Sequence, residues 1–129
     1  MKGNATLSAV AAAIGLAFSA CAPAEPLSKA VYDATRKDIA GDYKTARIGC
    51  EPMEGNVRDV CVADVKGRHE IALAELEVAY NPASGKALED LRLARARADH
   101  LVAIGKCDDK AGKARDVCMS EAKSRYPGS

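Results

Sequence analysis

The sequence predicts an all-α protein: two disulfide-closed helical hairpins forming an up-and-down four-helix array. Apolar residues recur at spacings of three, four and seven through most of the chain, and no stretch alternates as a strand would. A segment with a cysteine at each end and ten residues between them occurs twice, as CEPMEGNVRDVC and CDDKAGKARDVC. A glycine near the middle of each copy allows the chain to turn back there.

The chain of 129 residues is long enough for one small domain behind an amino-terminal leader. We assign residues 1–24 to a signal peptide. Lys2 supplies the positive start, and the apolar run LSAVAAAIGLAF is too short to span a bilayer. The remainder, 25–129, is expected to be one helical domain made of two repeats, at about 27–80 and 86–126.

Two cleavage positions fit the end of this leader. The small residues Ala22-Pro23-Ala24 suit cleavage before Glu25. Alternatively, the residues FSAC resemble a bacterial lipobox, which would make Cys21 the lipidated first residue and anchor the protein to a membrane. Either cut leaves four cysteines in the mature chain.

The charge balance argues against a nucleic-acid partner. Of 19 Lys and Arg, one lies in the leader, so the mature chain has 18 basic residues against 18 Asp and Glu. A nucleic-acid-binding surface needs an excess of basic residues. Leu, Ile, Val and Phe together fall just below the roughly 20% that usually accompanies a folded core. A core this thin allows an elongated array and needs disulfides for support.

Four helical segments follow the linker in order. In the first, about 27–50, one face consists of Tyr32, Ile39, Tyr43, Ala46 and Cys50. The second, 57–80, has a stripe of Val57, Cys61, Val65, Ala72 and Leu76. The break NPASG at 81–85 precedes the third, 87–106, whose stripe is Leu88, Leu91, Ala94, Ala98, Leu101 and Gly105. The fourth, about 113–126, is stopped by Pro127-Gly128.

The two cysteine segments belong to an internal repeat with an offset of 57 residues. The motif residues of the first copy are Cys50, Gly55, Arg58, Asp59 and Cys61. Their counterparts in the second copy are Cys107, Gly112, Arg115, Asp116 and Cys118. The repeated unit is therefore expected to be helix, glycine-containing turn, helix.

The cysteine spacing requires a turn if each motif forms its own disulfide. On one unbroken helix the two cysteines would be roughly 16 Å apart, whereas a disulfide needs Cα atoms within about 7 Å. We therefore predict bonds Cys50–Cys61 and Cys107–Cys118, although four cysteines allow three connectivities and spacing does not exclude the crossed ones. Asn56 is expected to cap a helix beginning at Val57, which would place Asp59 in its first turn, and Asp116 is expected at the matching position.

This pattern resembles small exported proteins of proteobacteria that repeat C-D-x-x-x-G-(N/K)-(A/V)-(K/R)-D-V-C within Ala-, Lys- and Glu-rich helices. Such proteins are loosely labelled TolA-like cell-envelope proteins. The resemblance covers Lys29 to Tyr126. It implies a location in the cell envelope, and it implies no chemistry and no catalytic residue.

Metal binding and redox chemistry are the alternatives to a structural role for the four cysteines. Zinc sites use cysteines two to four residues apart, and neither His69 nor His100 belongs to a two-histidine helical motif. Met53 and Met119 near the cysteines could suggest copper(I) ligands. An arginine three residues before Cys61 and before Cys118 would favour a thiolate. Closing a hairpin nevertheless accounts for all four cysteines, so we expect no metal and no cofactor.

No motif of hydrolytic catalysis or of phosphate binding is found in the sequence. The expectation is a non-enzymatic periplasmic or cell-envelope protein with a structural or interaction role. Its partner would be another envelope protein or a second copy of itself, with membrane contact only through a lipid anchor at Cys21. The alternative is a periplasmic metal-binding or redox-sensing helical module that uses the four cysteines.

Overall fold

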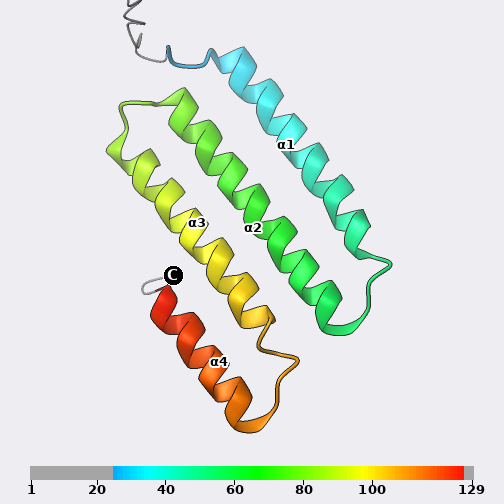
Figure 1. Cartoon of the computed structure of the whole chain (residues 1–129). Helices are drawn as coiled ribbons and strands as arrows, with labels where there is room; N and C mark the ends of the chain where they lie inside the picture. Colours follow the sequence, from blue (N-terminus) through cyan, green and yellow to red (C-terminus); the bar gives the residue numbers. More distant parts are fainter. Residues whose placement is uncertain (1–24, 127–129) are drawn as a thin grey trace, which may run out of the picture.

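The computed structural model describes residues 25–126 and has four helices in this part of the chain (Figure 1). They are α1 (Lys29–Cys50), α2 (Gly55–Tyr80), α3 (Gly85–Gly105) and α4 (Gly112–Arg125). The predicted all-α class is confirmed, and every helix end lies within two residues of its expected position. The proposed signal peptide and Cys21 lie outside the described residues.

The helices form an open array in which each one packs against its neighbours along the chain. Helix α2 lies between α1 and α3, and α4 packs against α3 (Figure 1). Among residues 25–126, no other pair of helices packs together. The most extensive contact is that between α2 and α3. The expected up-and-down array is therefore present, and its helices do not enclose a common central core.

Small residues bring α2 and α3 close together. Gly67 is buried in α2, and a Cβ atom added to it would lie 2.6 Å from the Cβ of Ala98. Further along the same interface, a Cβ on Gly105 would lie 3.3 Å from the Val60 side chain. Atoms at 2.6 Å overlap strongly, so the helices can approach this closely only because residue 67 has no side chain.

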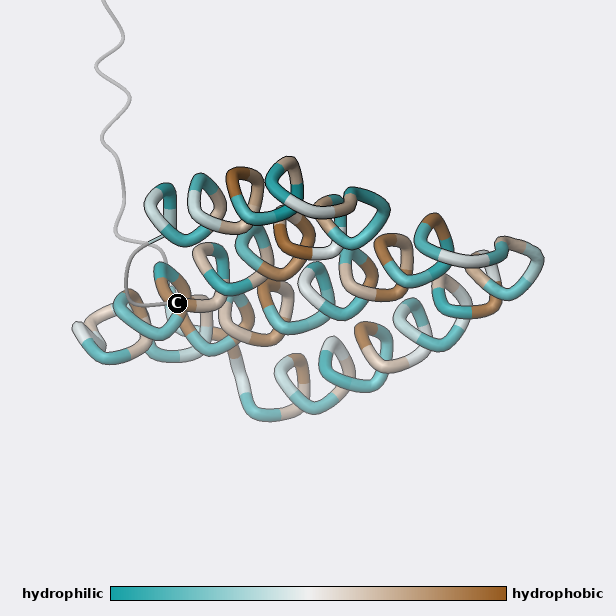
Figure 2. The backbone as a smooth tube through the Cα atoms, turned by 90° about the horizontal axis from the view of Figure 1, so that it is seen from below, coloured by the Kyte–Doolittle hydropathy of each residue, from teal (hydrophilic) through white to brown (hydrophobic). Residues whose placement is uncertain are grey.

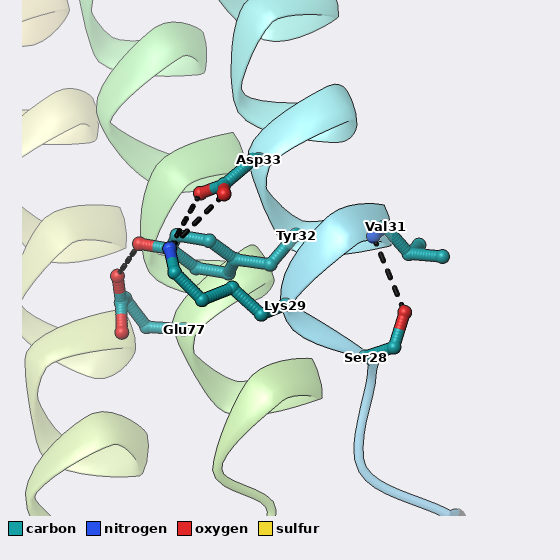
Figure 3. A network of polar contacts seen from close by, with 6 residues as sticks. All are labelled: Ser28, Lys29, Val31, Tyr32, Asp33 and Glu77. Carbon is teal, nitrogen blue, oxygen red and sulfur yellow. Dashed lines mark hydrogen bonds and ion pairs between the residues drawn. The ribbon is translucent and has the colours of Figure 1, made fainter.

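The α1–α2 hairpin is held at its open end by aromatic and polar contacts (Figure 3). The Tyr32 hydroxyl of α1 donates a hydrogen bond to the Glu77 carboxylate of α2, and the Tyr32 ring lies 4.7 Å from that of Tyr80. Just before α1, the Leu27 backbone N–H donates to the Ala79 carbonyl, 3.2 Å away. Lys29 and Asp33 form an ion pair of 3.0 Å beside this contact. The start of α1 is therefore fixed to the end of α2.

The helices that follow loops outside the cysteine motifs have side-chain N-caps. Ser28 accepts a hydrogen bond from the Val31 N–H, 3.3 Å away, and Ser84 accepts one from the Ala87 N–H, 3.2 Å away. Helix α2 has no such cap, which corrects the expectation for Asn56. This residue lies inside α2, the N-cap position is Glu54, and the Asn56 side-chain oxygen is buried without a hydrogen-bond partner.

Four residues expected on the core stripes are exposed instead. They are Ala46 of α1, Val57 at 66%, Leu88 at 52% and Leu101 at 41% of full exposure. Asp59 and Asp116 also lie beyond the first turns of their helices, because α2 begins two residues before the expected start and α4 begins one residue before it. An array in which α1 and α3 do not meet buries a narrow stripe of each helix, and Figure 2 shows short hydrophobic stretches interspersed with hydrophilic ones.

Candidate functional site

The two disulfides are the best-defined chemical feature of the described chain. Cys50 is bonded to Cys61 with Cα atoms 5.8 Å apart, and Cys107 is bonded to Cys118 with Cα atoms 5.7 Å apart. The predicted local connectivity is therefore confirmed. Cys50 and Cys107 have 1% and 0% exposed area, so each disulfide has one sulfur in the interior of the fold.

The same turn closes both disulfides. In the first motif the Met53 N–H donates to the Cys50 carbonyl, and in the second the Lys110 N–H donates to the Cys107 carbonyl; both distances are 3.1 Å. The chain then enters the next helix through Gly55 with φ +57° and Gly112 with φ +54°. L-residues with a Cβ rarely adopt this left-handed region, and glycine adopts it freely. The glycines predicted as the points of reversal are therefore required for backbone conformation.

The two arginines of the motif have different environments. Arg115 forms an ion pair with Asp108 at 2.9 Å, across the second turn. Arg58 is exposed and is in no ion pair with a described residue, although Glu51 occupies the position that matches Asp108. The motif acid Asp116 is likewise exposed. Matching residues in the two copies are therefore not equivalent in their contacts.

A pocket of about 220 Å³ lies between α1 and α2. The Tyr43 ring and the His69 ring stack in its wall with centroids 4.4 Å apart. Asp42 and Arg68 are its charged lining residues, and Arg68 is already paired with Asp64. The remaining lining residues are Ile39, Ala46, Val65 and Ala72. The pocket is part of the contact between α1 and α2.

Among residues 25–126, no group of three or more His, Cys, Asp or Glu side chains is placed to hold a metal ion. His69 and His100 lie on different helices, and each has an aromatic neighbour, Tyr43 for the first and Tyr126 for the second. Met53 is in the turn between α1 and α2, and Met119 is in α4. With their sulfurs in disulfides, the four cysteines have no thiolate for a metal in this oxidised form.

Among residues 25–126, the side chains whose pKa departs clearly from its ordinary value lie on the surface. The hydrogen bond to Glu77 raises the pKa of Tyr32. The hydrogen bond to Asp33 raises the pKa of Lys29. Within α3, the hydrogen bond from Arg92 lowers the pKa of Glu89. Each shift results mainly from one local partner, and none belongs to a cluster around a cleft.

The sequence patterns did not predict the close approach of Gly67 to Ala98 or the contact of Tyr32 with Glu77. A glycine within a helical pattern was the available signal for the first. The second joins residues 45 positions apart, and no local pattern identifies such a pair.

No helix within 25–126 has the length and apolar character needed to cross a membrane. Comparison with known proteins finds no matching family model, no matching curated protein and no matching solved structure.

Proposed function

We propose that this chain is an exported, non-enzymatic protein of the cell envelope whose helical array is maintained by two disulfides and acts by binding a partner. The observation that carries the proposal is the pair of local disulfides, each with one cysteine buried. Disulfides of this kind persist in non-reducing compartments such as the periplasm. The leader predicted at residues 1–24 supplies a route to that compartment.

Exposed apolar side chains support an interaction role. Several large aliphatic residues lie on the surface without a helix covering them, which leaves them available to another protein or to a second copy of the chain. They are Val31, Ile48, Val57, Leu88, Leu101 and Val117. The non-enzymatic part of the proposal is supported by the surface location of the shifted pKa values and by the structural role of all four described cysteines.

The test is to isolate the protein from fractionated bacterial cells and to determine its mass and cysteine state. The proposal expects the protein in the envelope fraction, with both local disulfides present in peptide maps without prior reduction. It also expects a mature end at Glu25 or an acylated Cys21. Crosslinking in intact cells should then recover either a second envelope protein or a dimer of the chain.

A cytoplasmic protein with free thiols would contradict this function. Purified protein that contains zinc or copper bound by its cysteines would favour the metal-binding alternative instead. Alkylation without prior reduction distinguishes the metal-binding alternative from the proposed function. Alkylation modifies thiolates and so releases a metal that they bind, whereas cysteines in disulfides do not react without reduction.

A further inference from the structure

Basic side chains from three helices gather around one exposed leucine. Arg47 at the end of α1 and Arg58 and Lys66 of α2 line a shallow depression together with Leu101 of α3. An adjoining depression has the same Leu101 in its lining, together with Arg97 and His100. We name this surface the basic face and define it as Arg47, Arg58, Lys66 and Arg97 around Leu101.

The cations of the basic face are largely without partners. Among the described residues, Arg58 and Arg97 form no ion pair, and Lys66 approaches Glu70 only to 4.0 Å. The Arg47 guanidinium lies 6.0 Å from the centre of the Tyr43 ring. All four basic side chains are exposed. Their charges are therefore available to a ligand in solution or to a surface.

On the opposite side of α2, two arginines do form ion pairs with carboxylates. Arg68 is two residues from Lys66 and therefore about 200° around the helix. It is paired with Asp64, and Arg95 of α3 is paired with Glu75 of α2 at 2.8 Å. These two arginines are therefore neutralised by neighbouring carboxylates, whereas Arg58 and Arg97 of the basic face have no such partner among the described residues.

Two carboxylates also lie on the basic face. They are Asp59 and Glu70, so the two depressions have two acidic and four basic side chains in their linings. The chain as a whole has a formal net charge of only +1. The imbalance on this surface is therefore local, as expected for a site that faces a negatively charged partner rather than for a generally basic protein.

We propose that the basic face binds the anionic surface of a phospholipid bilayer, with Leu101 entering the headgroup region. This rests on the proposed envelope location, which places the protein beside such a surface. Leu101 is 41% exposed in the middle of the basic side chains, and an apolar residue among Lys and Arg suits an interface that is anionic outside and apolar beneath. The depressions are shallow and span three helices, which suits a broad surface better than one small anion.

The test is co-sedimentation of the purified, disulfide-bonded chain with lipid vesicles. The chain has Cys21→Ser so that no acyl chain contributes to binding. Vesicles that contain phosphatidylglycerol should bind it, neutral phosphatidylcholine vesicles should bind it much more weakly, and added salt should weaken the difference. The triple variant Arg47→Gln/Arg58→Gln/Lys66→Gln should bind the anionic vesicles at least about tenfold more weakly. Leu101→Ser should weaken binding without changing its salt dependence.

A matched control removes three charges elsewhere, as Lys106→Gln/Lys113→Gln/Lys123→Gln, and should bind nearly as well as the parent. Circular dichroism and disulfide mapping check that each variant folds, and Arg58→Gln alone serves if the triple variant does not. Equal losses in the two triple variants, or no preference for anionic vesicles, would overturn the proposal. If the protein is found in the envelope but does not bind these vesicles, the result contradicts the proposed membrane binding and does not contradict the proposed function.

Discussion

At the scale of single residues, Gly55 and Gly112 have the two positive φ values found among residues 25–126. A Cβ atom at either position would meet no atom within 4 Å apart from the neighbouring residues and the backbone of its own helix. The requirement for glycine is therefore conformational and not steric. Each glycine allows the chain to leave a disulfide-closed turn and to begin a helix directly, which explains how α2 and α4 form without a side-chain N-cap.

Replacing either turn glycine by alanine should destabilise the protein. We expect Gly55→Ala and Gly112→Ala each to lower the free energy of unfolding by about 1–2 kcal/mol, the usual cost of a left-handed conformation for an L-residue. Urea unfolding followed by circular dichroism measures this. Gly41→Ala is the control, because Gly41 lies inside α1 with open space around it. This control should gain about 0.5–1 kcal/mol, and a gain in all three variants would contradict the conformational argument.

Gly67 is required for the opposite reason, because its surroundings leave no room for a side chain. Gly67→Ala would place its Cβ 2.6 Å from that of Ala98, so α2 and α3 must separate at a cost of about 1–3 kcal/mol. Ala98→Gly should restore much of this loss in the double variant, because it removes the other half of the clash. A double-mutant cycle of unfolding free energies measures the coupling. Additive effects would show that the two helices adjust independently.

The bond between Tyr32 and Glu77 should make part of the stability depend on alkaline pH. Since the hydrogen bond raises the pKa of Tyr32 in the folded state, its contribution is fully present below the unfolded value of about 10. It is lost as the pH rises through the folded pKa. The stability difference between the parent and Tyr32→Phe should therefore shrink above pH 10. Urea unfolding of the two proteins over this pH range measures the difference.

At the scale of helices, the two disulfides close similar turns on unequal hairpins. The first joins α1 and α2, which also contact each other at their far ends through Tyr32 and Glu77. The second joins α3 to α4, a helix of only 14 residues. Isolated helices of about this length are marginal in water. Helix α4 therefore depends more on its disulfide than α1 does.

Removal of each disulfide should consequently have a different result. Each bridge is expected to contribute about 3 kcal/mol in the chain-entropy model. Cys50→Ala/Cys61→Ala should lower the unfolding temperature of the whole array. Cys107→Ala/Cys118→Ala should instead lose the helicity of α4 before the main transition, which remains near that of the parent. Circular dichroism during heating distinguishes the two patterns. Identical melting curves for the two variants would show that α4 does not depend more on its disulfide than α1 does.

At the scale of the whole molecule, the sequence predicted four helices and an up-and-down array, and it favoured the local pairing of the cysteines without excluding the crossed ones. These features follow from local periodicity and from the distance limit between two cysteines. The exposure of Val57, Leu88 and Leu101 could not be predicted in this way. A helical stripe shows which residues share a face, but the width of the buried part depends on how many neighbours each helix has. The basic face likewise depends on the assembly of three helices.

The open array should also determine how the protein unfolds. Contacts are confined to helices adjacent along the chain, so stability is distributed nearly as in a one-dimensional repeat array. Helix α2 is covered on two sides and makes the largest contact, with α3, whereas α4 contacts α3 alone. Native-state hydrogen exchange should therefore show the strongest protection in α2 and α3, less in α1 and the least in α4.

These differences in hydrogen-exchange protection among the four helices should respond to a change at one helix–helix interface. Gly67→Ala weakens the contact between α2 and α3, so it should reduce protection in both of these helices by a similar factor and reduce the difference between them and α4. A change confined to α4, such as loss of its disulfide, should leave amide exchange in α1 and α2 almost unchanged, because neither helix touches α4. Mass spectrometry of peptic fragments resolves the four helices. If exchange accelerated equally in all four after the change in α4, the helices would unfold as one cooperative unit, and the one-dimensional account of the array would be wrong.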